Sequence, residues 1–200
     1  MNAKKAENIQ KMTHFIQARY RGLLLQFDYN RLEERSSMKA NGIEIGYQVR
    51  GTGEPLILIM GLGAGGELWE EHVKAYEKAF SCILVDNRGA GGSDKPEGPY
   101  TTRMMADDIA ALMQVLGIKK AGIAGLSMGG AIAQCLAIHH PEKVRSLVIA
   151  CSWARCDAYL KRVIEHLQSA RRFLPPVDFA RMLQLLIFTP EYHRTNLENQ

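Results

Sequence analysis

The sequence predicts an α/β fold: a mostly parallel sheet that is covered by helices on both faces and followed by a helical lid. Three observations support this prediction. Short runs that are apolar at every position alternate with helical patterns, as expected for buried parallel strands. A glycine-rich turn joins one such strand directly to a helix. After Ala150 the strand pattern stops, and only helical segments follow.

Composition narrows the function classes. The 200 residues are 46% hydrophobic and 23% charged, which is typical of a globular domain. The net charge is +4, and residues 1–38 carry seven Lys/Arg against four Asp/Glu. The remainder is close to neutral, which argues against a nucleic-acid partner. No apolar run approaches the roughly 18 residues of a membrane span. The four cysteines lack zinc spacing, so we expect reduced thiols, no metal and a cytoplasmic location.

Residues 1–38 are predicted to form a helical extension. Apolar residues recur there at helical spacing, with lysine and arginine between them. Two roles are open: a helix that packs on the domain or a partner subunit, a homo-oligomer included, or a helix on a membrane surface. The periodic residues are Ile9, Met12, Ile16, Tyr20, Leu23 and Phe27.

Residues 39–152 are assigned to the core. The Asn41-Gly42 pair predicts a tight hairpin, because both turn positions favour positive φ. The alternating segment Ile43–Val49 follows as a strand. The other predicted strands are Leu56–Met60, Cys82–Asp86, Ala121–Gly125 and Arg145–Ala150. The predicted helices are Glu67–Ala79, Met105–Leu116 (ended by Gly117) and an Ala- and Ile-rich helix that Pro141 ends.

Residues 153–200 are assigned to the lid. A helix from Ala158 is expected to end at Pro175-Pro176, and a second helix is expected over Phe179–Phe188. Asp178 is the predicted cap of the second helix and Pro190 its stop. No strand follows, so we expect the chain to end before the final strands of the core.

The chemistry is predicted to reside at Ser127. This serine lies in a Gly-x-Ser-x-Gly motif between an apolar strand and a small-residue helix. A serine there must adopt a strained backbone on a sharp turn, a nucleophile elbow, and Gly125 and Gly129 remove side chains that would collide. The turn places the hydroxyl at the carboxyl edge of the sheet, where open α/β sheets bind ligands.

Acyl transfer also needs donors for the oxyanion of the tetrahedral intermediate. The backbone amide of Met128, directly after the serine, is one candidate. The backbone amide of Leu62 is the other, in the glycine-rich loop Gly61–Gly66 after an apolar strand. The flanking glycines allow that loop to approach a ligand closely, so the two amides form a predicted oxyanion hole.

These motifs, in this order, resemble the α/β-hydrolase superfamily. The segments Asp86–Ser93 (DNRGAGGS), Gly98–Thr102 (GPYTT), Gly125–Gln134 (GLSMGGAIAQ) and His140–Val148 (HPEKVRSLV) are most similar to the branch with 3-oxoadipate enol-lactonases and carboxylesterases. The resemblance implies a cofactor-free hydrolase. It also implies that Asp86 begins a structural turn, in which we expect Asp86 and Arg88 to satisfy one another.

The sequence departs from this family in two ways. Many members begin the oxyanion loop with His-Gly, where this chain has Met60-Gly61. The family also places an acid and a histidine after the lid, beyond this chain. Asp157 is a weak alternative for the acid, and His193 is the histidine kept open as a base. Structural or surface roles are expected for His14, His72, His139, His140 and His166.

The predicted function is a serine hydrolase that cleaves an ester, lactone or thioester of a small molecule through an acyl-enzyme on Ser127. The chain would be a fragment that lacks the acid and histidine of the triad. Two alternatives stay open. The first is a non-catalytic ligand-binding or scaffold protein derived from a hydrolase. The second is a triad that a partner chain completes.

Overall fold

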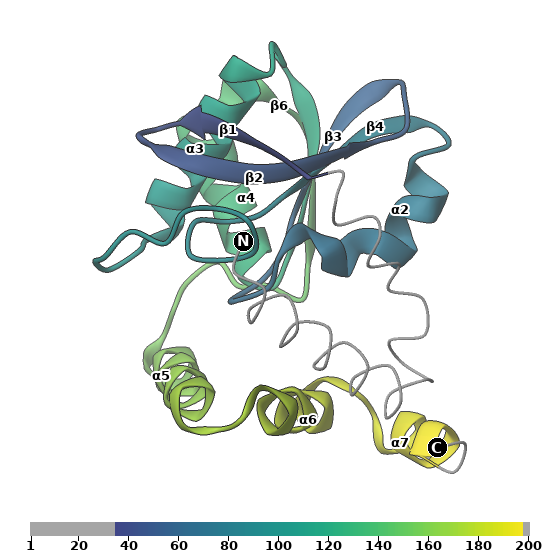
Figure 1. The fold of residues 1–200 in the computed structure, drawn as a ribbon, viewed down its shortest axis with the longest axis vertical. Coiled ribbons are helices and arrows are strands. Elements are labelled where there is room, and N and C mark those ends of the chain that lie inside the picture. Colours follow the sequence, from purple (N-terminus) through teal and green to yellow (C-terminus); the bar gives the residue numbers. More distant parts are fainter. Residues whose placement is uncertain (1–34, 198–200) are drawn as a thin grey trace, which may run out of the picture. The chain divides into compact units, whose positions relative to one another are not determined.

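The computed structural model describes residues 35–197 and places a six-stranded sheet in the order β1-β2-β4-β3-β5-β6 (Figure 1). Strands β4, β3, β5 and β6 run parallel to one another, whereas β1 and β2 are antiparallel to their neighbours. The predicted sheet, mostly parallel and covered by helices, is confirmed. The strands are β1 (Ser36–Ala40), β2 (Ile43–Arg50), β3 (Glu54–Ile59), β4 (Phe80–Val85), β5 (Ala121–Leu126) and β6 (Val144–Ala150).

The predicted hairpin connects β1 and β2. Asn41 and Gly42 have φ values of 48° and 79°, and Ala40 faces Ile43 across the turn. Residues 36–38 therefore belong to a strand. The predicted helical extension over 1–38 is wrong for these last three residues. A cross-strand partner decides the conformation of this short segment, and local periodicity does not reveal that partner. Residues 1–34 of the predicted extension lie outside the described residues.

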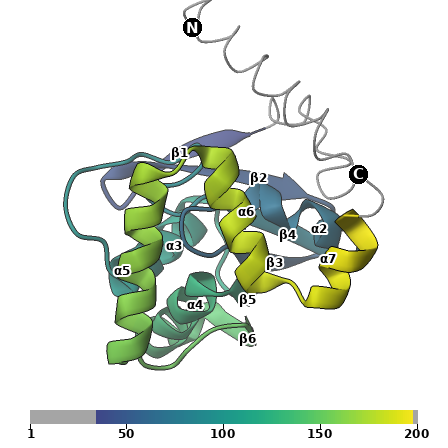
Figure 2. The same ribbon diagram turned by 90° about the horizontal axis from the view of Figure 1, so that it is seen from below.

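The parallel strands are buried on both faces. In β3, Ile57 and Ile59 belong to one apolar cluster and Leu58 to the other, as expected when successive side chains point to opposite faces. The first cluster is completed by helices α3 (Thr102–Val115) and α4 (Met128–His139), and the second by η2 (Gly66–Trp69) and α2 (Glu70–Tyr76). Helices α3 and α4 lie on one side of the sheet and α2 on the other (Figures 1 and 2).

The helix boundaries follow local signals. The Thr101 hydroxyl accepts a hydrogen bond from the Met104 amide at 3.0 Å and caps α3. Gly117, with φ of 71°, follows the end of α3 as predicted. The predicted helix Glu67–Ala79 begins as the 3₁₀ turn η2 and continues as α2. Pro141 ends α4 and begins a short turn, η3 (Pro141–Lys143).

Residues 156–197 belong to a second compact unit, which is described here by itself. It contains α5 (Ala158–Phe173), α6 (Pro176–Ile187) and α7 (Pro190–Leu197), joined by short connections (Figure 2). Helix α6 ends before Pro190, as predicted, but Pro190 also begins α7, a helix that was not predicted. The predicted cap of α6 is wrong. Asp178 lies inside the first turn of α6, and Pro175 is its N-cap.

Candidate active site

Ser127 occupies the connection between β5 and α4 in a backbone conformation that side chains other than glycine rarely adopt. Its φ and ψ are 56° and −124°, and Ser127 is the N-cap of α4. The predicted strained turn at this residue is therefore present. Strain of this kind costs about 1–3 kcal/mol and persists only where the surrounding structure imposes it. Such strain is typical of a serine that presents its hydroxyl above a sheet.

Backbone contacts enforce this conformation. The Ser127 amide donates to the Ala150 carbonyl oxygen at 2.9 Å, and the Gly130 amide donates to the Ser127 carbonyl oxygen at 2.9 Å. Ala150 is the last residue of β6, and the next residue, Cys151, also has a positive φ of 50°. The end of β6 therefore fixes the amide group of Ser127, and the first turn of α4 fixes its carbonyl group.

Glycine is required on both sides of Ser127. A Cβ atom on Gly125 would lie closer to the carbonyl oxygen of Gly129 than real Cβ atoms come to any neighbour. A Cβ atom on Gly129 would collide in the same way with the carbonyl oxygen of Ile59, the last residue of β3. The first turn of α4 thus packs directly against the backbone of β3 and β5, which a larger side chain would prevent.

The glycine-rich loop after β3 lies beside the serine. A Cβ atom on Gly61 would lie 3.1 Å from Ser127 Cβ and 3.4 Å from Ser127 Oγ. Gly63 has φ of 69°, and the Leu62 side chain between these glycines is 45% exposed. The structure thus brings together the two segments that contain Ser127, Met128 and Leu62.

Asp86 and Asn87 hold the two ends of this loop. Asn87 Nδ2 donates to the Met60 carbonyl oxygen at 2.9 Å, directly before Gly61. Asp86 Oδ1 accepts from the Gly66 amide at 2.7 Å. Asp86 and Asn87 are only 2% and 4% exposed. Sequence analysis missed Asn87, although its place directly after an apolar strand, at the carboxyl edge of the sheet, is a usable signal.

The expected pairing of Asp86 with Arg88 is wrong. Asp86 Oδ2 is 2.8 Å from an Arg35 guanidinium nitrogen and accepts from the Gly92 amide at 2.7 Å. Arg88 instead makes two hydrogen bonds of 2.5 Å with Asp108 of α3. Both partners come from distant parts of the chain, Arg35 for Asp86 and Asp108 for Arg88. The hydrogen bonds to Asp108 raise the pKa of Arg88, although burial opposes this shift.

No histidine of residues 35–155 hydrogen-bonds Ser127. His140 Nε2 is 2.7 Å from Asp107 Oδ1, and the His72 ring packs edge-on against Trp69. Burial alone would raise the pKa of Asp107, but hydrogen bonds from His140 and Arg103 outweigh it and lower that pKa. His139 is exposed at the end of α4.

The candidate acids and bases of the second unit, Asp157, Asp178, His166 and His193, have local partners. Asp157 Oδ1 accepts from the Leu160 amide at 2.8 Å and caps α5. The Asp178 carboxylate is 3.1 Å from Arg181. His166 Nδ1 is 2.7 Å from the Arg162 carbonyl oxygen, and His193 Nε2 is 3.2 Å from the Gln184 carbonyl oxygen. The role kept open for His193 as a base stays a prediction.

No group of three or more histidine, cysteine, aspartate or glutamate side chains within residues 35–197 is arranged to hold a metal ion. No helix in this range combines the length and apolar character that crossing a membrane requires.

Two curated bacterial proteins are similar to this chain in sequence. A protein assigned as the carbamate hydrolase RutD of Azorhizobium caulinodans is 33% identical over 151 residues, which cover 76% of this chain and 57% of that protein. A protein assigned as the non-heme bromoperoxidase BpoC of Mycobacterium tuberculosis is 38% identical over 144 residues, 70% of this chain and 55% of its own length. The chain thus spans about half the length of these curated relatives.

Solved structures and a family model show the same relationship. The crystal structure of the enol-lactonase from Burkholderia xenovorans LB400 superposes with a TM-score of 0.69 at 28% identity, and the match covers 80% of this chain and 62% of the lactonase. This confirms the resemblance to enol-lactonases that the motifs predict. The model of the alpha/beta hydrolase fold matches residues 54–196. The chain therefore belongs to the α/β-hydrolase fold family.

Proposed function

We propose that Ser127 is the nucleophile of a hydrolase that cleaves a carboxylic ester, lactone or thioester. The observation that carries the proposal is the conformation of Ser127, with φ of 56° at the junction of β5 and α4 and Gly61 packed against its side chain. Strained backbone of this kind is concentrated at functional sites. It is explained by a hydroxyl that must face a bound carbonyl at the carboxyl edge of the sheet.

The oxyanion would be bound by the backbone amides of Met128 and Leu62. Met128 is the first residue of α4, where the first four amides of a helix lack intrahelical acceptors. The positive end of the α4 dipole adds to the attraction for a developing negative charge. Leu62 lies in the loop that Asp86 and Asn87 anchor, so its amide would be held before the substrate arrives. Fixed donors of this kind lower the barrier because they need no reorganisation during the reaction.

The proposed reaction has two steps. Ser127 Oγ attacks the acyl carbon and loses its proton to a base, and the tetrahedral intermediate collapses by breaking the bond to the leaving alcohol or thiol. The acyl group is then bonded to Ser127 Oγ. Water attacks this acyl-enzyme, which releases the carboxylic acid and restores the serine hydroxyl.

A general base is required because a serine hydroxyl is a weak nucleophile at neutral pH. No histidine within residues 35–155 hydrogen-bonds Ser127, so the base would come from outside that range. The family resemblance implies a histidine that an acid orients. The substrate class rests on the relatives, whose names include an enol-lactonase and a thermophilic esterase from Thermogutta terrifontis.

Covalent labelling tests the proposal. The protein expressed from its full coding sequence would be treated with a fluorophosphonate, and the modified residue identified by mass spectrometry. Label is expected on Ser127 and lost in Ser127→Ala. Ser146→Ala, which changes an exposed serine of the adjacent strand β6, is the matched control and should label normally.

Two results would contradict the proposal. A wild-type protein that stays unlabelled while it is folded would show that Ser127 is not an activated nucleophile. If that protein also bound a small ligand saturably, and Ser127→Ala left the affinity unchanged, the non-catalytic binding protein would be the better description. Activity that appears only with a second polypeptide would instead support a triad shared between chains.

A further inference from the structure

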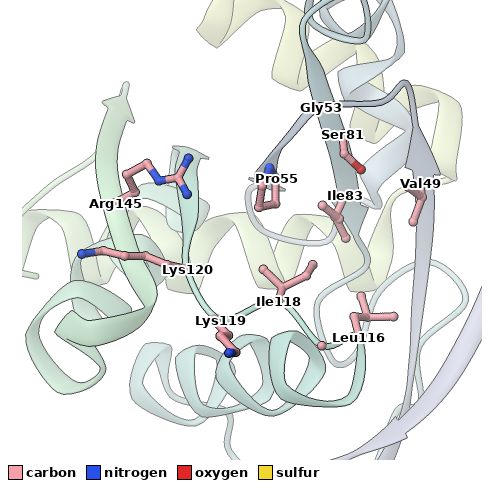
Figure 3. Close-up of a pocket in the computed structure, with 11 residues that line it drawn as sticks. Val49, Gly53, Pro55, Ser81, Ile83, Leu116, Ile118, Lys119, Lys120 and Arg145 are labelled. Atoms are coloured by element: carbon pink, nitrogen blue, oxygen red, sulfur yellow. The ribbon is translucent and has the colours of Figure 1, made fainter.

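A cavity of about 520 Å³ opens at the edge of the sheet opposite Ser127 (Figure 3). Its walls come from the start of β3 at Pro55, the start of β4 at Ser81, the start of β6 at Arg145 and the connection from α3 to β5. The parallel strands begin at this edge and end at the edge of Ser127. The cavity is therefore separate from the proposed active site, and its volume is within the range of small-molecule pockets.

The floor of the cavity is apolar. Pro55, Ile83, Leu116 and Ile118 converge toward its centre, with Val49 on the far side (Figure 3). Ile83 is 1% exposed and belongs to the core, whereas Val49 is 49% exposed although it is a large apolar side chain. An apolar ligand body that covered Val49 would remove this surface from water, which favours binding roughly in proportion to the buried area.

The charged lining of the cavity has one sign. Lys119, Lys120 and Arg145 line it, and no aspartate or glutamate is among its lining residues. Both lysines are exposed, and neither has an ion-pair partner within the described part of the chain. Arg145 pairs with Glu54, at the first position of β3. The carbonyl end of α3 offsets a fraction of this charge, but two full positive charges stay unpaired.

A polar group is also available at the wall. The Ser81 side chain lines the cavity at the start of β4, near Pro55 and Ile83 (Figure 3). Its hydroxyl can donate to or accept from a ligand oxygen. An apolar floor with cations and one hydroxyl at its margin is complementary to a molecule with an apolar body and a single anionic head.

We propose that this cavity binds an amphipathic monocarboxylate, with its apolar body over Ile83, Ile118 and Val49 and its carboxylate at the basic margin that includes Lys119 and Lys120. A cationic ligand would meet repulsion from both lysines. A strongly polar ligand would leave the apolar floor without a partner. The site is independent of the proposed chemistry at Ser127, because strand β5 separates Lys120 from the serine by its whole length, Ala121–Leu126.

The test is an NMR titration of the ¹⁵N-labelled full-length protein with octanoate, which contains no ester, lactone or thioester bond for Ser127 to cleave. Saturable shifts are expected in the amides of Gly117, Ile118 and Lys120. Lys120→Glu should weaken the affinity roughly tenfold, because an attraction at close range becomes a repulsion. Lys39→Glu, which changes an exposed lysine of β1 by the same charge, is the matched control and should leave the affinity unchanged.

Octylammonium and 1-octanol complete the test. Both should bind more weakly than octanoate, octylammonium most weakly of all. The proposal is overturned if the Gly117–Lys120 amides show no saturable shift up to about 10 mM octanoate, a concentration that would detect even millimolar affinity. It is also overturned if Lys120→Glu and Lys39→Glu bind equally well. Shifts confined to residues around Ser127 would place the carboxylate at the proposed acyl site and reject this one.

Discussion

Asn87 Nδ2 donates a hydrogen bond of 2.9 Å to the carbonyl oxygen of Met60, and this contact orients the peptide that leads into the loop beside Ser127. Removing the donor leaves a buried carbonyl without a partner. Complete loss of one oxyanion donor typically lowers kcat by a factor of about 10²–10³. Asn87→Leu would misplace the donor without removing it, so we expect kcat to fall about tenfold or more. The KM should change less, because the donor acts mainly in the transition state.

Asn87 could position the loop or stabilise the fold. Steady-state ester hydrolysis measures the first role, and chemical unfolding of the same preparation measures the second. The unpaired carbonyl alone should reduce the free energy of unfolding by about 1–3 kcal/mol. If kcat is unchanged well below the melting temperature, the contact stabilises the fold and does not position the loop.

Gly129→Ala should prevent normal folding of the elbow. The new Cβ would collide with the carbonyl oxygen of Ile59, which is backbone and cannot move away cheaply. We expect the free energy of unfolding to fall by about 3 kcal/mol or more. Gly92→Ala is the matched control: its Cβ would lie 3.5 Å from Asp86 Oδ2, an ordinary contact, and should cost far less. Urea unfolding of both variants measures the difference, and equal losses would contradict the collision.

The Arg88–Asp108 pair should be sensitive to the loss of one partner. The two side chains are only 9% and 4% exposed, so Asp108→Asn leaves a nearly buried guanidinium without its counter-charge. Breaking a buried pair in this way typically costs about 3–5 kcal/mol. Arg103→Met removes an arginine that is 49% exposed from its pair with Asp107 and should cost less than about 1 kcal/mol. Similar costs for both variants would show that burial does not strengthen the Arg88 pair.

Asp107 should make stability depend on pH in the acid range. Its pKa is lowered in the folded protein, so the folded state binds the proton less well than the unfolded state does. The contribution of Asp107 to the free energy of unfolding is therefore complete above its unfolded pKa of about 3.9. It is lost as the pH falls through the lower pKa of the folded state. Asp107→Asn should lower the melting temperature at pH 7. The difference in melting temperature between Asp107→Asn and the wild type should disappear below about pH 4. A difference that is constant from pH 7 to acid would contradict the shifted pKa.

The sheet and the elbow were predictable because their signals are local. A continuous apolar run such as Ile57–Ile59 indicates burial on both faces, and Asn41-Gly42 indicates a turn with positive φ. The strand β1 was not predictable in the same way, since its conformation depends on pairing with β2. Proline gave an ambiguous signal at Pro190, because the residue that stops one helix is also favoured at the start of the next.

Side-chain partners around the site were the hardest part to predict. Arg35 and Gly66 approach Asp86 from positions 51 and 20 residues away in the sequence. Asn87 contacts a carbonyl 27 residues before it. The loops after β3 and β4 meet because these parallel strands end at one edge of the sheet, whereas Arg35 approaches Asp86 from the start of β1. The strand order therefore had to be known first. The sequence contains the residues but does not reveal which loops become neighbours.

Under the proposed function, the positive φ of Ser127 sets activity and stability against each other at a single position. Glycine adopts this conformation without strain, so Ser127→Gly should make the protein more stable and inactive, whereas Ser127→Ala keeps the strain and loses only the hydroxyl. A screen for thermal stability alone would therefore enrich an inactive protein. Under the proposed function, only selection for the hydroxyl would keep a serine at this position.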